Sequence, residues 1–401
     1  DLTKKNEKSV LTMGSTIKWG VIFMCKKVIV TLLTATILAL MFLPVSASIL
    51  YGDVNQDGSI DSLDLTLLKR HILKKSTINY IVFADLDGDG EVTSIDFTLL
   101  KRYLLRKITE FPVNSLNADA VRLDELMGAS VNTITNRFGQ PNRVDLSRYG
   151  FDWYIYNSDY KKYIQIGIKD GKVVGIYSNS QYYKFNENIG IGTRKTFVEE
   201  ELGSPLARIV KGSTSYKMND KDEWKVYNIN NKYYTTFFYD LKNEIDVMAF
   251  MMIDYDTEQS LKSYYGTPSE RLRTSYEMEI FDIANAFRSR YGRPPLKWSN
   301  EMAALSRAFS MDMVQKGYFD FTDSNGNIFT DRMKSSGIKY SNAAELIAKG
   351  QMDSMFVVAS WMSSNKSSTI IGIYECVGIG VSMESDGCPV YVYDTFVPSK
   401  Y

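Results

Sequence analysis

The spacing of apolar residues divides the chain into three folded regions. Leu and Ile residues recur every three or four positions after Ser62 and again after Ser94, which predicts two short amphipathic helices. Tyr-rich segments between Asn114 and Thr257 have the composition of antiparallel strands. Beyond Glu277, two segments with helical spacing precede two alternating apolar strands. We therefore predict a multidomain α+β protein.

Each of the two short helices follows a loop rich in side-chain oxygen. From Asp53, such side chains occupy loop positions 1, 3, 5, 9 and 12, and Gly58 stands at position 6, where a cation-binding loop must turn sharply. The pattern recurs from Asp85, 32 residues later. Two loops in register predict two Ca²⁺ sites. No helix of comparable quality precedes either loop, which argues against a sensor-type EF-hand pair.

Residues 52–110 resemble a type I dockerin, the Ca²⁺-dependent module that joins secreted proteins to cohesin modules of a bacterial cellulosome. The resemblance implies a small all-α fold that binds two Ca²⁺ ions. It implies as ligands Asp53, Asn55, Asp57, Asp64 and the Ser59 carbonyl for one ion, and Asp85, Asp87, Asp89, Asp96 and the Glu91 carbonyl for the other. The positions implied to contact cohesin are Ser62, Leu63, Lys69 and Arg70, and equivalently Ser94, Ile95, Lys101 and Arg102. Because the two sets are nearly identical, either face should bind a cohesin.

The middle region, residues 114–257, contains a weaker repeat. Segments from Gly128 and Gly192 align with a 64-residue offset, and each predicts a short helix followed by aromatic strands. Asp170-Gly171 predicts a hairpin turn. We predict one α+β repeat domain, whose layout resembles the domain that commonly precedes bacterial CAP domains. A carbohydrate-stacking surface is an alternative role for the aromatic residues, although their preference for strands explains them more simply.

Residues 272–401 resemble the CAP superfamily of cysteine-rich secretory and pathogenesis-related proteins, through landmarks that include "PLKW", "AELIA" and "VGIGV". The resemblance implies an α/β/α sandwich with a cavity that usually carries two histidines and acidic partners able to bind a divalent metal. Here the histidine positions hold Phe321 and Ser367, and of the family's cavity residues we place only Glu345.

A lone carboxylate without imidazoles cannot form the usual zinc site, and an apolar Phe321 should occupy part of the cavity. Asp320, Asp323 and Asp394 could add oxygens, but we interpret them as acidic surface residues. We therefore predict neither a His-type Zn site nor hydrolysis at Glu345.

Composition excludes several classes of function. The single histidine, His71, lies on a predicted helix away from any candidate nucleophile, which argues against Ser/His/Asp and Cys/His catalysis. The 47 basic and 47 acidic residues balance, so no global field favours nucleic acid. Cys376 and Cys388 are compatible with a disulfide or with two free thiols.

The N-terminal pattern predicts secretion. Residues 24–47 combine two lysines, an apolar run and a small-residue ending, as a signal peptide does, and we expect cleavage near Ala47. A membrane anchor is the alternative, but the apolar run is short for a bilayer. Residues 1–23 precede this segment and are interpreted as an upstream extension. We expect a secreted, extracellular, cellulosome-associated protein without membrane contact after cleavage.

Two classes of function remain. The first is a non-catalytic cellulosomal component whose CAP domain binds a glycan, peptide or lipid or has a structural role. The second is an enzyme of polysaccharide catabolism, a glycoside hydrolase, or a protease carried as dockerin cargo. A glycosidase needs two facing carboxylates at a fixed separation, and no such pair is recognisable. The first class is therefore favoured.

Overall fold

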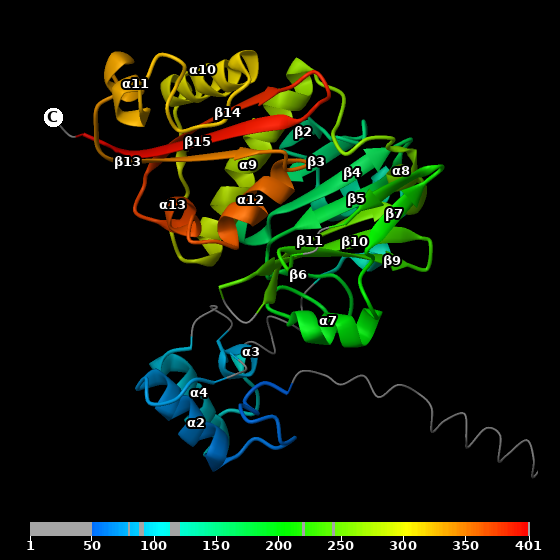
Figure 1. Ribbon diagram of the computed structural model, residues 1–401. Coiled ribbons are helices and arrows are strands. Elements are labelled where there is room, and N and C mark those ends of the chain that lie inside the picture. The colour runs from blue at the N-terminus through cyan, green and yellow to red at the C-terminus, as the bar shows by residue number, and fades with distance from the viewer. Residues whose placement is uncertain are drawn as a thin grey trace, which may run out of the picture. The chain divides into compact units, whose positions relative to one another are not determined.

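The computed structural model describes residues 50–78, 81–87, 92–112, 121–218, 221–242 and 245–399 (Figure 1). Residues 1–23, the predicted signal peptide at 24–47, and the predicted ligands Asp89 and Glu91 lie outside these ranges. Among the described helices, none has the length and apolar character needed to cross a bilayer.

The N-terminal region is helical and contains α2 (Ser62–Ile72), α3 (Ile81–Ala84) and α4 (Ser94–Leu104). Asp61 and Thr93 cap α2 and α4, since each side chain accepts a hydrogen bond from a backbone N–H of the first turn. Wholly buried Leu68 and Leu100 bring the two long helices into one apolar core. Neither helix could bury this apolar stripe alone, so the two copies fold together.

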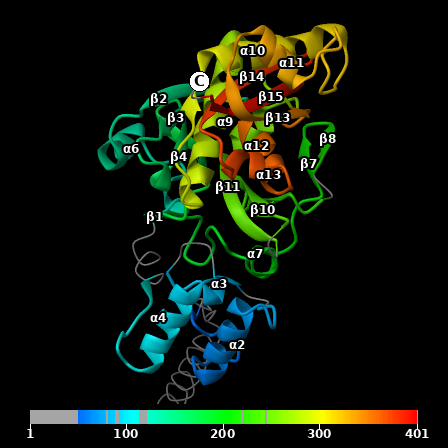
Figure 2. The same cartoon turned by 90° about the vertical axis from the view of Figure 1, so that its left-hand side faces the viewer.

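A seven-stranded antiparallel sheet dominates the middle region (Figure 2). Its strands, in spatial order, are β2 (Arg143–Leu146), β3 (Asp152–Tyr156), β4 (Ile164–Lys169), β5 (Lys172–Ser178), β11 (Asp246–Asp254), β10 (Tyr233–Asp240) and β9 (Trp224–Ile229). Asp170 and Gly171 both have positive φ at the β4–β5 turn, the backbone geometry of a tight two-residue hairpin.

Two helices cover one face of this sheet, α6 (Val131–Phe138) and α7 (Lys195–Leu202). They lie 64 residues apart, as the sequence repeat predicts, and each ends at a glycine. The smaller elements of the region are β1 (Val121–Arg122), η1 (Asp124–Leu126), η2 (Tyr160–Lys162), β6 (Tyr183–Lys184), β7 (Arg208–Lys211), β8 (Thr214–Lys217) and α8 (Tyr255–Ser260).

The aromatic residues of the middle region form its interior. All eight residues of β10 are buried, and no described Tyr, Phe or Trp between residues 121 and 257 is exposed. Their side chains pack into the two cores on either face of the sheet. This arrangement supports the strand-propensity explanation over a carbohydrate-stacking surface.

A four-stranded sheet forms the centre of the C-terminal region, in the order β12 (Lys297–Trp298), β14 (Cys376–Met383), β15 (Pro389–Pro398) and β13 (Tyr340–Lys349). The helices are α9 (Glu270–Arg290), α10 (Asn300–Lys316), α11 (Phe329–Ser335), α12 (Ser354–Met362) and α13 (Ser367–Ile371). Gly378 and Gly380 in "VGIGV" face α10 so closely that an added Cβ would lie 2.2 Å from its backbone nitrogens. These glycines let α10 lie directly on β14.

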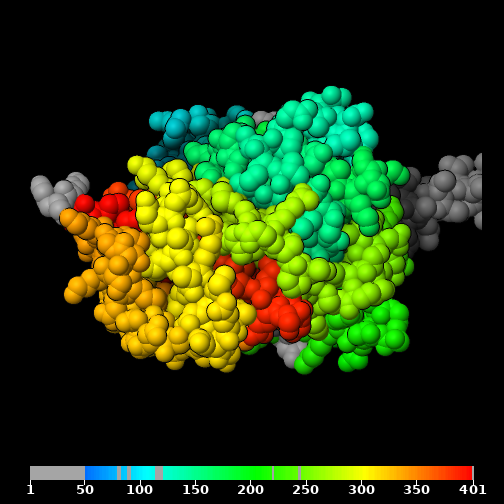
Figure 3. Space-filling view, turned by 90° about the horizontal axis from the view of Figure 1, so that it is seen from above, coloured from blue at the N-terminus to red at the C-terminus, as the bar shows by residue number. Residues whose placement is uncertain are grey.

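The middle and C-terminal regions share one apolar core. Residues of the seven-stranded sheet pack in a single cluster with α9, α12 and the C-terminal sheet. In the space-filling view of Figure 3, yellow residues of the C-terminal region adjoin green residues of the middle region. Polar bonds cross the same boundary: Arg143 pairs with Asp282 at 2.6 Å, and Arg148 with Asp353 at 3.0 Å. We infer that residues 121–399 fold as one unit, so neither region is suited to study as an isolated fragment.

The two described cysteines are free. Cys376 begins β14, whereas Cys388 lies beyond the other end of that strand, next to Pro389, which pairs with Met383. Eight strand residues separate the two ends by roughly 25 Å, far more than a disulfide spans. Of the two alternatives left open by the sequence, the structure has the free thiols.

Candidate functional site

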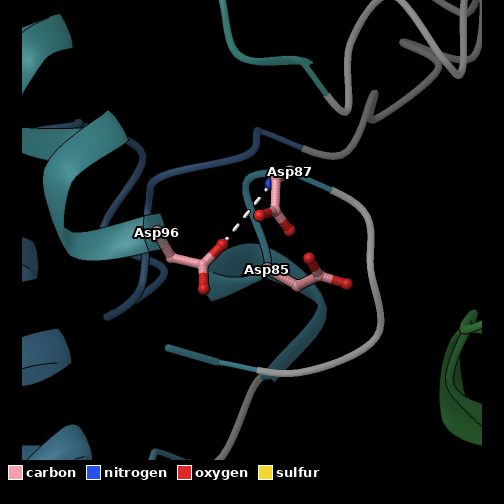
Figure 4. Close-up of side chains that lie close together, drawn as sticks. All are labelled: Asp85, Asp87 and Asp96. Atoms are coloured by element: carbon pink, nitrogen blue, oxygen red, sulfur yellow. Dashed lines mark hydrogen bonds between the residues drawn. The ribbon is translucent and has the colours of Figure 1, made fainter. Parts of the chain in front are cut away.

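The second N-terminal loop gathers three carboxylates. Oxygens of Asp85, Asp87 and Asp96 lie within 4.8 Å of one another. Figure 4 shows the three side chains side by side. Asp96 is wholly buried, and its Oδ1 accepts a hydrogen bond of 2.7 Å from the backbone N–H of Leu86. Such a set, made only of oxygen ligands, is what Ca²⁺ prefers.

In the first loop, backbone N–H groups donate hydrogen bonds to two of the predicted ligands. The carboxylate of Asp53 accepts hydrogen bonds from the backbone N–H groups of Asp57 and Gly58, at 3.1 and 2.9 Å. Asp64 accepts the backbone N–H of Asn55 at 3.1 Å. Gly58 has a φ of 87°, which favours glycine at the sharp turn. The backbone of the first loop thus folds around two of its predicted ligands, the carboxylates of Asp53 and Asp64.

Asp64 and Asp96 show why a cation fits these loops. Both carboxylates are wholly buried, and neither pairs with a basic side chain in the part of the chain that the structure describes. Burial raises the pKa of Asp64, and the nearby charge of Asp53 adds to the rise. A bound divalent cation would supply the missing opposite charge, so the donor set fits Ca²⁺.

The predicted cohesin-contacting side chains are exposed on α2 and α4. Leu63 and Ile95 are large apolar residues, yet 58% and 54% of their surface is accessible. Lys69 and Arg70 on α2, and Lys101 and Arg102 on α4, follow two turns later on the same helix face. Two equivalent faces are thus presented to solvent.

Two further exposed apolar residues near the ends of these helices were not predicted. Leu73 and Leu105, one turn after the basic pairs, are 53% and 57% exposed. They are the C-cap residues of α2 and α4, ten positions after Leu63 and Ile95 and about a quarter turn away from them around the helix. An apolar residue at the end of an otherwise basic, solvated face was the sequence signal that could have found them.

The C-terminal region places Glu345 against an arginine rather than in an open cavity. Glu345 lies on β13, almost wholly buried, and its Oε1 accepts a hydrogen bond from Nη2 of Arg332 on α11. The guanidinium also donates to the carbonyls of Phe321 and Asn327, at 3.0 and 2.9 Å, and lies 3.6 Å from the centre of the Phe309 ring. An internal cation therefore neutralises Glu345.

Phe321 does not fill the cavity, and that part of the prediction was wrong. Its side chain is 49% exposed, and only its backbone carbonyl is turned toward Arg332. The reason is the turn that contains Asp323, whose carboxylate accepts the backbone N–H groups of Asn325 and Asn327 at 2.9 Å.

Asp394 is not an acidic surface residue, in contrast to the prediction. It is wholly buried on β15, directly opposite Glu345 in the β13–β15 register. Ser306 of α10 donates a hydrogen bond of 2.7 Å to its Oδ2. Burial raises the pKa of both carboxyl groups, and that of Asp394 lies well above its usual range. Asp320, in contrast, is exposed and accepts the backbone N–H of Thr322.

Ser367 also meets a cation. It begins α13, is buried, and accepts a hydrogen bond of 2.7 Å from Nζ of Lys242, which follows β10 in the middle region. The two positions where the CAP resemblance implies histidines therefore adjoin a guanidinium and an ammonium of the chain itself. These residues do not fit a His-type divalent metal site.

Two hollows lie near the boundary of the middle and C-terminal regions, away from Glu345. One encloses about 30 Å³ next to the buried Arg148, Lys211 and Glu258, room for roughly one water. The other is a more open groove of about 430 Å³ lined by residues 146–150 and 257–267. Neither hollow contacts the Glu345 carboxylate.

Comparison with known proteins identifies three successive segments. Residues 51–105 match the dockerin type I domain, residues 127–281 the CAP-associated N-terminal domain, and residues 281–395 the cysteine-rich secretory protein family. The uncharacterized membrane protein YlbC of Bacillus subtilis is 25% identical over 283 residues, which are 64% of this chain and 79% of that protein.

Two solved structures resemble different parts of the chain. An extracellular SCP-domain protein from Bacillus anthracis covers 69% of this chain and 96% of its own length, at 20% identity and a TM-score of 0.61, which shows a shared fold. A chain from the complex of the third cohesin ScaC with the ScaB dockerin of Acetivibrio cellulolyticus is 35% identical, covering 17% of this chain and 99% of that chain with a TM-score of 0.17.

Proposed function

Because the chain joins a dockerin type I domain to a CAP-associated domain and a CAP domain, in that order, we propose that it is a secreted docking protein. Its dockerin binds a cohesin module of a cellulosomal scaffold, and its CAP domain acts as a non-catalytic binding or structural module. The observation that carries this proposal is the pair of matching exposed faces on α2 and α4, each directly after a Ca²⁺-type loop.

Calcium stabilises the fold of the docking module in this proposal. Asp64 stands at the last loop position and also at the third residue of α2, where its Oδ2 accepts the backbone N–H of Asp61 at 2.8 Å. Asp96 does the same for Thr93 at 2.7 Å. One carboxylate thus joins the loop to the helix start, so two bound ions would hold both recognition helices in place.

The chemistry of the two faces defines the partner surface. Each face presents a large apolar side chain and a Lys-Arg pair, a combination that suits an apolar surface with acidic neighbours. The two faces differ mainly by Leu63 in place of Ile95, so they should bind the same cohesin with similar affinity.

The proposed non-catalytic role of the CAP domain rests on Glu345. A general acid or base must reach its substrate, but Glu345 is almost wholly buried and paired with Arg332. The second carboxyl group, Asp394, lies opposite it inside the sheet and does not flank a cleft, as a glycosidase requires. Secretion is supported by the signal-like pattern of residues 24–47.

Calorimetric titration of the full chain with a type I cohesin module, in Ca²⁺ and in EDTA, tests docking. We compare Leu63→Ala/Arg70→Ala, which alters the α2 face, with its match Ile95→Ala/Arg102→Ala on α4. Either double variant should bind within about twofold of the wild type, and the quadruple variant at least about 100-fold more weakly. Absence of wild-type binding in Ca²⁺ would reject the docking function, whereas loss in one double variant would assign docking to one face.

A separate assay tests the non-catalytic role. The full chain with Ca²⁺ is incubated with plant cell wall and with casein, next to Glu345→Gln. We expect no release of reducing sugar or peptide by either protein. Turnover by the wild type that Glu345→Gln abolishes would establish an enzyme at this site.

A further inference from the structure

Four elements of the CAP domain meet around two buried acids. Glu345 of β13 and Asp394 of β15 are directly opposite in the antiparallel pair, while Arg332 approaches from α11 and Ser306 from α10. All four side chains are buried or nearly so. Solvent therefore contributes little to the balance of charge in this cluster.

The hydrogen bonds use one oxygen of each acid. Glu345 gives Oε1 to Arg332, and Asp394 gives Oδ2 to Ser306. The other two oxygens, Glu345 Oε2 and Asp394 Oδ1, have no hydrogen-bond partner among the described residues, and neither has Nε of Arg332. Because the two acids face each other across the strand pair, a single proton held between them would satisfy both oxygens.

The balance of charge in the cluster also favours one bound proton. If both acids were ionised, Arg332 would neutralise one and leave a net negative charge in the interior, which is strongly unfavourable. The other groups that face the pair are the neutral Ser306 hydroxyl and the Phe309 ring, which lies against Arg332. One retained proton makes the cluster neutral.

We propose that Asp394 and Glu345 hold one proton between them at neutral pH, bound to Asp394 Oδ1 and donated to Glu345 Oε2. Asp394 is the acid of the pair because it is wholly buried and lacks the arginine, whereas Glu345 keeps the ion pair. The CAP domain thus contains a proton-binding site, closed by its own guanidinium. A divalent cation could enter only by displacing the proton and Arg332.

The site also fixes a surface loop. Arg332 connects Glu345 to the carbonyls of Phe321 and Asn327, so loss of the proton would place an unbalanced charge beside the anchor of residues 318–328. Above the ordinary carboxyl range the unfolded chain has released this proton and the folded chain has not. The unfolding equilibrium constant should therefore rise about tenfold per pH unit until the folded site ionises.

Two variants test the proposal in the full chain with Ca²⁺. Asp394→Asn keeps a donor toward Glu345 Oε2, and Glu345→Gln leaves Asp394 as the single counter-charge of Arg332. Each variant makes the cluster neutral without a proton. Asp320→Asn, which removes an exposed carboxylate from the neighbouring loop, is the matched control.

The measurements are the infrared signal of protonated carboxyl groups at neutral pH and the pH dependence of urea unfolding. We expect both cluster variants to lose part of the infrared signal relative to Asp320→Asn. We also expect their unfolding equilibrium constant to rise less steeply with pH, by about a factor of ten per pH unit. Should one variant fail to fold, the other suffices. An unchanged infrared signal, or a pH dependence equal to that of the wild type, in the folded variants overturns the proposal.

Discussion

Buried carboxylates occur at both ends of this chain, Asp64 and Asp96 in the dockerin and Glu345 and Asp394 in the CAP domain. The dockerin pair has backbone N–H donors but no basic partner among the described residues. The CAP pair has Arg332 and, in our proposal, a proton. In our proposals, the buried charge is balanced by an ion from solution in the dockerin and by groups of the protein in the CAP domain.

This difference separates the conditions on which each region depends. A fold completed by a dissolved ion responds to the concentration of that ion. The stability of a site whose charges are balanced by the protein's own side chains depends on pH and on substitution of those side chains, and not on the concentration of a dissolved ion. The experiments below either separate the two regions or show that they behave alike.

The largest expected effect is removal of Ca²⁺. In EDTA, α2 and α4 should lose their structure, since the charge of the buried loop acids is no longer balanced. Limited trypsin digestion should then cut at Lys69, Arg70, Lys101 and Arg102, while residues 121–399 stay resistant. Digestion in Ca²⁺, and again after Ca²⁺ is restored, provides the control.

If the dockerin stays resistant to trypsin in excess EDTA, its fold does not depend on a divalent ion, and the proposed difference between the two regions is wrong. Cleavage within residues 121–399 in EDTA would also contradict this difference, because it would show that the CAP domain needs a divalent ion as well. Asp64→Asn/Asp96→Asn should reproduce the EDTA pattern in Ca²⁺, since the substitutions remove charge from the two loop positions that also cap helices.

A smaller effect is expected from Arg332→Met. Removal of the guanidinium leaves the Glu345 charge buried without a partner, which typically destabilises a protein by about 3–5 kcal/mol. The free energy of unfolding of the 121–399 unit, measured in urea, should fall by this order. Restoration of much of that loss in Arg332→Met/Glu345→Gln is expected, because the double variant no longer contains the unpaired charge.

If the double variant is as unstable as the single one, packing of Arg332 on Phe309 would account for the effect rather than the ion pair. Addition of Zn²⁺ or Ca²⁺ should leave the stability of the wild-type unit unchanged. Rescue of Arg332→Met by a divalent ion would indicate that the arginine occupies the place of a metal.

The sequence predicted the dockerin site better than the CAP site for a physical reason. The predicted calcium ligands of each loop lie within twelve consecutive residues, so their spacing alone predicts a shared ion site. The helices that follow have local caps, Asp61 and Thr93, which act over a few residues. Local interactions of this kind are visible in sequence.

The pairing at Glu345 is not local. Arg332 lies 13 residues away across a turn and a strand start, and Asp394 reaches Glu345 only through the pairing of β13 with β15. The strand pattern around Asp394 could not show its burial, because its neighbours Tyr393 and Thr395 are also wholly buried. A strand covered on both faces has no polar side from which burial can be inferred.

The smallest predicted effect concerns Lys242, the second basic group of the chain that meets a position of the CAP site. Lys242→Met should destabilise the 121–399 unit by about 0.5–1.5 kcal/mol, because the hydrogen bond to the buried Ser367 is lost and the lysine is partly exposed. A double-mutant cycle with Ser367→Ala measures the pair directly and should give a coupling of about 1 kcal/mol. If no coupling is measured, Lys242 does not stabilise this position, and Arg332 is the only one of the two basic groups that balances charge at the CAP site. The middle domain would then contribute packing but no charge to that site.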